Sequence, residues 1–79
     1  MPHPHRRFSR IKLRERRRAA GLTLEQFAVA VSRSWSTVHE YERGRVTPPT
    51  DALPLIAAIL DCELDDLFEP EVAALEVVP

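Results

Sequence analysis

The hydrophobic positions of this chain recur at intervals of three and four residues, the spacing of one face of an α-helix. The pattern predicts helices over residues 10–20, 24–31, 34–44, 51–60 and 64–68. No period-2 alternation or hairpin dipeptide indicates a β-strand. We therefore predict an all-α fold of five short helices around one core. The expected inward residues, in chain order, are Leu13, Arg17, Ala20, Phe27, Ala28, Val31, Val38, Tyr41, Glu42, Leu53, Ile56, Ala57, Leu60, Leu64, Leu67 and Phe68.

Capping residues set the expected helix boundaries. Side chains that can accept from the free N–H groups of a first turn lie at the beginnings of four of the helices: Ser9, Thr23, Ser34 and Thr50. Gly21 and Gly44 lie at the ends of the first and third helices, where a left-handed residue commonly ends a helix. Only Ser32 and Arg33 lie between the second helix and the next cap, so the second and third helices should meet across a tight turn.

The helix over residues 34–44 has two different faces. Val38, Tyr41 and Glu42 share the inward face. The other face carries hydrogen-bonding groups and an aromatic ring: Trp35, Ser36, His39, Glu40 and Arg43. Such a helix is suited to presenting these groups to a partner.

The net charge of −1 conceals a segregation of charge along the chain. Residues 1–22 carry eight of the 11 basic side chains and a single acid, whereas residues 47–79 carry eight of the 12 acids and no base. This asymmetry indicates a polyanionic partner on one side of the molecule. A solvated charge run is the alternative for any one third of the chain, but a basic block that leads into the presenting helix favours the polyanion.

Composition excludes several classes of protein. The 79 residues fit one domain, and the lone Cys62, in an apolar run, is expected to be a small core residue in a reducing compartment. No segment has the length and apolar character of a membrane span or signal peptide, so we predict a cytoplasmic protein. His3 and His5 lack further ligands at suitable spacing, and no catalytic constellation is present, so we predict no metal site, no cofactor and no enzymatic activity.

The predicted pattern is two capped helices joined by a tight turn, followed by Glu-Arg-Gly and a proline loop. In this pattern the chain resembles the Cro/CI-type helix-turn-helix family of phage repressors and bacterial regulators. The likeness covers residues 11–68. Its matching segments are Ala20-Gly21-Leu22-Thr23, Phe27-Ala28, Ser34 with Ser36-Thr37-Val38, Tyr41-Glu42-Arg43-Gly44-Arg45, Thr47-Pro48, the apolar residues Leu53, Ile56, Ala57 and Leu60, and Leu64-Asp65-Asp66-Leu67-Phe68. The resemblance implies a five-helix, lambda-repressor-like domain whose third helix enters the DNA major groove.

The resemblance also implies roles for individual residues. The base-reading positions are Trp35, Ser36, His39 and Glu40. Phosphate contacts are expected from Thr23, Arg33, Thr37, Arg43 and Arg45, together with Arg6, Arg7 and Arg10 from the beginning of the chain. In the family an inward arginine of the first helix pairs with the glutamate before Arg-Gly, and here these positions are Arg17 and Glu42, a structural ion pair.

Several positions depart from the family pattern. Ser32 and Arg33 replace the glycine and apolar residue of the usual turn, Leu24 replaces a phosphate-binding glutamine, and Asp61 replaces a glycine. Two interpretations of Trp35 stay open: it stacks on thymine methyls or sugar, or it folds back over the space left by Arg33.

Glu40 also allows two roles. Its carboxylate can accept from a cytosine amino group, or it can pair with Arg43 or an arginine of the first helix.

The expected organisation is a flexible basic arm (residues 1–9), a helix-turn-helix DNA-binding domain (residues 10–68) and an acidic and apolar tail (residues 69–79). The expected function is a sequence-specific transcriptional regulator of double-stranded DNA, a repressor acting as a homodimer, since one helix reads too few base pairs alone. The alternative is an antitoxin whose tail binds a toxin partner. The tail is a candidate for self-association, and a tail that folds on its own core or is disordered is the competing interpretation.

Overall fold

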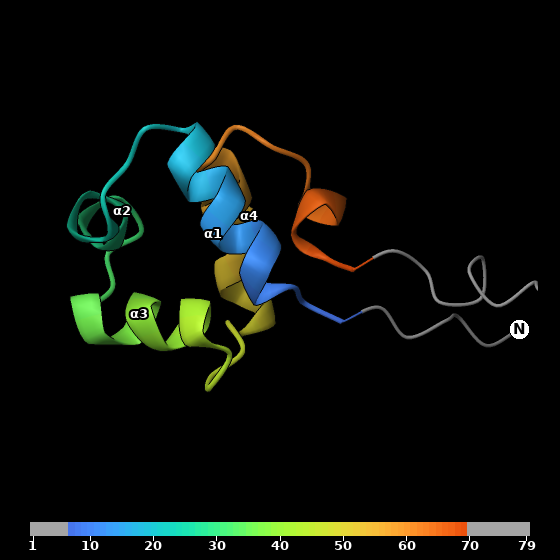
Figure 1. The fold of residues 1–79 in the computed structure, drawn as a ribbon, viewed down its shortest axis with the longest axis horizontal. Helices are drawn as coiled ribbons and strands as arrows, with labels where there is room; N and C mark the ends of the chain where they lie inside the picture. The colour runs from blue at the N-terminus through green and yellow to red at the C-terminus, as the bar shows by residue number, and fades with distance from the viewer. Residues whose placement is uncertain (1–6, 70–79) are drawn as a thin grey trace, which may run out of the picture.

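A computed structural model describes residues 7–69 and confirms the all-α prediction. The α-helices are α1 (Arg10–Ala19), α2 (Leu24–Ala30), α3 (Trp35–Arg43) and α4 (Leu53–Ile59). Two single turns of 3-10 helix, η1 (Thr50–Ala52) and η2 (Leu64–Leu67), complete the described chain. In Figure 1, α2 and α3 lie on one side of α1 and η2 lies on the other. The count of four α-helices and two 3-10 turns differs from the five helices predicted.

The first three helices begin and end where their capping residues predict. Ser9 and Ser34 accept from the backbone N–H groups of Lys12 and Thr37, at 3.1 Å in each case. Thr23 forms a reciprocal capping box with Gln26. The N–H of Gln26 donates to Oγ1 of Thr23 at 3.1 Å, and the N–H of Thr23 donates to Oε1 of Gln26 at 2.9 Å. Gly21 and Gly44 adopt left-handed conformations, with φ of 76° and 80°. These caps fix α2 and α3 at the two sides of one tight turn.

One hydrophobic cluster joins all of these elements. Its buried members are Leu13, Phe27, Ala28, Val31, Val38, Tyr41, Ala52, Ile56, Ala57, Leu60 and Leu67. Leu53 is also buried, and Phe8, Leu22 and Phe68 pack against the cluster from its edge. Most of the predicted inward residues are therefore in the core.

Thr50 does not cap an α-helix as predicted. It begins η1, where the N–H of Ala52 donates to the carbonyl of Pro49 at 2.9 Å, and α4 starts three residues later, at Leu53. The cause is Pro54, which has no N–H to donate to the carbonyl of Thr50 and whose ring would collide with that carbonyl. The first turn is consequently 3-10.

Two predicted core residues are exposed. Ala20 follows the last residue of α1 as its C-cap, where the helix has already passed the edge of the core. Leu64 is at the beginning of η2, and this single turn presents Leu67, which has no exposed surface, to the core in its place. The error at Ala20 comes from extending the helical face of α1 past the last residue of that helix.

The two ends of the described chain pair with each other. Ser9 donates from its N–H to the carbonyl of Leu67 at 2.8 Å, and Glu69 donates to the carbonyl of Arg7 at the same distance. Phe8 meets Phe68 edge to face, with ring centroids 6.2 Å apart. Residues 7–9 and 67–69 therefore lie side by side, on the η2 side of α1 (Figure 1).

Candidate nucleic-acid interface

α3 is held by an entirely buried face. Val38 has no exposed surface, and Tyr41 and Glu42 are 2% and 7% exposed. The buried carboxylate of Glu42 meets the guanidinium of Arg17 from α1: Nε donates to Oε2 at 2.6 Å and Nη2 donates to Oε1 at 3.1 Å. Apolar packing and a bidentate ion pair thus fix the rotation of α3 about its own axis.

The opposite face of α3 carries the four residues expected to read bases. Trp35 and Ser36 are exposed, and His39 and Glu40 are half-buried. The rings of Trp35 and His39 stack with centroids 4.5 Å apart and planes inclined by 24°. Trp35 is 47% exposed and outside the core cluster, so it does not fold back into the interior.

Glu40 has a partner that the sequence did not predict. Its carboxylate Oε1 is 3.8 Å from Nε of Arg45, in the segment after α3, and not beside Arg43 or an arginine of α1. The last turn of α3 brings Arg45 back toward Glu40, as the hydrogen bond from the N–H of Arg45 to the carbonyl of Glu40 at 3.1 Å shows. This pair is open to water and is therefore weak.

The residues expected to hold phosphates lie mainly on the surface. Arg7, Arg10, Arg33, Arg43, Arg45 and Thr23 are exposed, Thr37 is half-buried, and Arg6 lies outside the described residues. Thr23 and Thr37 both take part in helix caps: the Thr23 hydroxyl accepts from Gln26, and that of Thr37 is 2.8 Å from the Ser34 hydroxyl.

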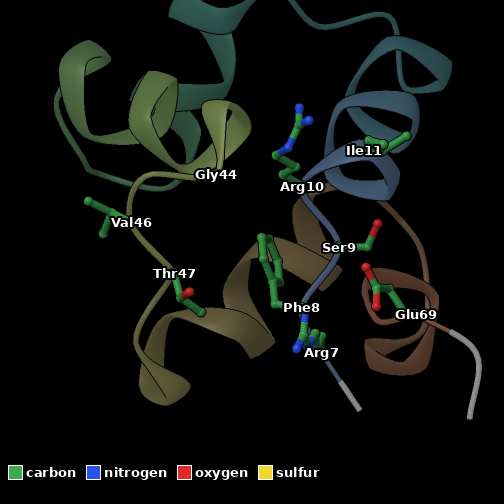
Figure 2. Close-up of a pocket in the computed structure, with 9 residues that line it drawn as sticks. All are labelled: Arg7, Phe8, Ser9, Arg10, Ile11, Gly44, Val46, Thr47 and Glu69. Atoms are coloured by element: carbon green, nitrogen blue, oxygen red, sulfur yellow. The ribbon is translucent and has the colours of Figure 1, made fainter. Parts of the chain in front are cut away.

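A cavity of about 320 Å³ lies between the beginning of α1 and the segment after α3 (Figure 2). Arg7 and Arg10 line it from one side and Val46 and Thr47 from the other. Arg10 extends to the C-cap of α3, so close that a Cβ at Gly44 would be 2.5 Å from its Cδ. This approach places a cation beside the negative end of α3.

The sequence did not predict that Arg14 lies near the outer face of α3. This residue of α1 lines a cavity of about 240 Å³ together with Trp35, His39 and Arg43 on α3 and Leu24 on α2. Its spacing could have found it, because Arg14 precedes Arg17 by three residues and therefore shares the side of α1 that faces α3.

Within residues 7–69, no group of three or more His, Cys, Asp or Glu side chains is arranged to hold a metal ion. Cys62 packs against the core, and its pKa is raised, first by burial and then by Asp66, Asp61 and Glu63, while Arg16 opposes them. His3 and His5 lie outside the described residues.

Comparison with protein families gives the identity of the fold. A family model described as a helix-turn-helix domain matches residues 10–69. The chain belongs to this family. No curated protein sequence matches the chain significantly.

Solved structures of other helix-turn-helix proteins agree with this assignment. The restriction-modification controller protein C.AhdI from Aeromonas hydrophila is 34% identical, with a TM-score of 0.70 over 75% of this chain and 89% of that one. The clp gene regulator ClgR from C. glutamicum is 29% identical, with a TM-score of 0.69 over 73% of this chain and 74% of that one. These neighbours are regulators, as expected for the Cro/CI-type family recognised in the sequence.

The DNA-binding domain of the P22 C2 repressor shares the fold at 20% identity, with a TM-score of 0.71 and 84% of each chain covered. The fold of this helix-turn-helix protein is therefore lambda-repressor-like. Among residues 7–69, no helix combines the length and the apolar character needed to cross a bilayer.

Proposed function

We propose that this helix-turn-helix protein is a sequence-specific transcriptional regulator that places α3 in the major groove of double-stranded DNA. The observation that carries the proposal is the division of α3 into a face fixed by Val38, Tyr41 and Glu42 and an outer face of base-reading groups. A rigid helix loses little conformational freedom on entering the groove, so its outer side chains can discriminate between base edges.

The exposed arginines supply the phosphate contacts in this proposal. Arg33 lies in the turn before α3, and Arg43 and Arg45 lie at the end of this helix. Arg7 and Arg10 line the cavity shown in Figure 2. Each phosphate they neutralise releases counterions, so affinity should fall steeply as salt is added. Arg6 would extend this set from outside the described residues.

A homodimer is the expected assembly. One recognition helix contacts few base pairs, whereas two copies related by a two-fold axis read two half-sites about 34 Å apart. Such a dimer bound across a promoter would repress transcription by occupying the DNA that the polymerase needs. A regulator of this kind acts in the cytoplasm, a location that suits the single reduced cysteine.

Selection of bound duplexes from a random pool tests the proposal directly. We expect the full chain to enrich a palindromic site, to bind it more tightly than a scrambled duplex of equal length, and to sediment as a dimer on that site. Failure to bind any double-stranded DNA at low ionic strength would contradict the proposal. An asymmetric site bound by one copy would contradict only the homodimer.

The antitoxin alternative depends on residues 69–79, of which the structure describes Glu69 alone. No contact within residues 7–69 favours it over the regulator.

A further inference from the structure

The stacked rings of Trp35 and His39 form an aromatic pair on the outer face of α3. The two residues are one helical turn apart, and the centroids of their nearly parallel rings are 4.5 Å apart. The indole is nevertheless 47% exposed, which is unusual for the only tryptophan in a chain of 79 residues. Stacking covers one side of the ring and leaves an apolar surface for a partner.

The pair lies beside a cavity of about 240 Å³, which Leu24 of α2 and Arg14 of α1 also line. His39 is half-buried, and the more exposed indole stacks on its ring. A ring positioned in this way before binding loses little rotational freedom when it meets a ligand.

The neighbours of Trp35 along the chain make the indole prominent. Ser34 and Ser36 on either side are small and exposed. Trp35 is the first residue of α3, at the end of the helix that contacts base edges in helix-turn-helix complexes. The first large group to reach the groove is therefore aromatic and chiefly apolar.

Major-groove base edges offer one apolar group, the C5-methyl of thymine, and otherwise present hydrogen-bond donors and acceptors. We propose that Trp35 reads a thymine methyl in each half-site and that His39 is the positioning residue that holds the indole against it. This inference rests on the proposed function and specifies the base feature that it recognises.

Deoxyuridine provides the test, because it lacks only the methyl group. Each thymine of the selected site is replaced in turn in both half-sites, and the affinity of the full chain is measured for each duplex. We expect one thymine position in each half-site to respond. Each replacement at that position should lower the affinity about fourfold, the effect of losing one buried methyl group. No loss at any position, or a selected site without a thymine in common between its half-sites, would overturn the inference.

Variants distinguish the contact that Trp35 makes with the methyl group from the positioning of Trp35 by His39. Trp35→Ala should abolish the preference for thymine over deoxyuridine. His39→Ala should reduce that preference below about twofold, and His39→Phe, which keeps a stacking ring, should restore it. If His39→Phe behaves like His39→Ala, then stacking does not position Trp35.

A matched control is Val29→Ala, which removes an 80% exposed apolar side chain from the neighbouring helix α2 and should leave the thymine preference unchanged. The two proposals fail differently. Specific binding without a methyl preference overturns only this inference, whereas absence of binding to every duplex overturns the proposed function as well.

Discussion

Arg17 and Glu42, 25 residues apart in the chain, form a bidentate ion pair between α1 and α3, with Nε to Oε2 at 2.6 Å. Their side chains are 11% and 6% exposed. Arg17 also donates from Nη1 to the carbonyl of Leu22 at 2.8 Å, in the loop that leads to α2. One guanidinium thus connects α1, α3 and the loop that leads to α2, and the orientation of α3 depends on it.

Loss of Arg17 should be costly because the partner carboxylate would remain buried without a counter-charge. We expect Arg17→Ala to lower the free energy of unfolding by about 3 kcal/mol. Urea unfolding of the full chain, followed by circular dichroism, measures this. Arg14→Ala is the matched control, since Arg14 is an exposed arginine of the same helix, and it should change stability by less than about 0.5 kcal/mol. Equal losses in the two variants would mean that the pair is not what holds α3.

The sequence predicts the fold well where one local signal decides the outcome. The Ser34 hydroxyl caps the beginning of α3, and Gly44, which has no Cβ, ends it in a left-handed conformation. Val38, Tyr41 and Glu42 mark its buried face by spacing alone. These features depend only on residues within one or two helical turns of each other, so they can be predicted from the local sequence.

Features that depend on tertiary contacts were not predictable from spacing. The pairing of Ser9 with Leu67 joins the two ends of the described chain through backbone groups, which carry no sequence signal. Trp35 and His39 are four residues apart on α3, so spacing alone places their rings on one side of the helix. Whether the indole lies on the surface or in the interior depends on tertiary packing, which is why the sequence left the orientation of Trp35 open.

The turn between α2 and α3 contains a strained residue. Ser32 has φ of 58°, a left-handed conformation that costs a residue with a Cβ roughly 1–2 kcal/mol. We expect Ser32→Gly to raise the free energy of unfolding by about 0.5 kcal/mol, because relief of this strain exceeds the added entropy of the unfolded chain. Ser36→Gly, inside α3, should lower it by about the same amount. Thermal unfolding of the two variants beside the parent checks the sign, and a destabilised Ser32→Gly protein would show that the turn is not strained.

The thiol of Cys62 should react slowly. Burial raises the pKa of this thiol, and the carboxylates of Asp66, Asp61 and Glu63 raise it further against the opposing charge of Arg16. Because the thiolate is the nucleophile, a raised pKa means a smaller reactive fraction at neutral pH and a rate that continues to rise at alkaline pH above the ordinary thiol range. Alkylation by iodoacetamide, followed by mass spectrometry, should be slower in the native protein than in urea at pH 7. A native rate equal to the denatured rate would contradict this expectation.

Base-reading and phosphate-binding residues should give different signatures in DNA binding. Ser36 is exposed on the outer face of α3, so Ser36→Ala should relax the sequence preference at one base pair per half-site while affinity for non-specific DNA stays nearly constant. Arg43 is exposed at the end of α3, where a phosphate contact carries no base information. Arg43→Ala should therefore weaken binding to all duplexes alike and reduce the slope of log K against log salt by about 1 for each phosphate that is no longer neutralised. Fluorescence anisotropy titrations of the selected and scrambled duplexes at several salt concentrations distinguish these outcomes. If Ser36→Ala weakened both duplexes equally, or Arg43→Ala changed the preferred sequence, the assigned roles of the two residues would be wrong.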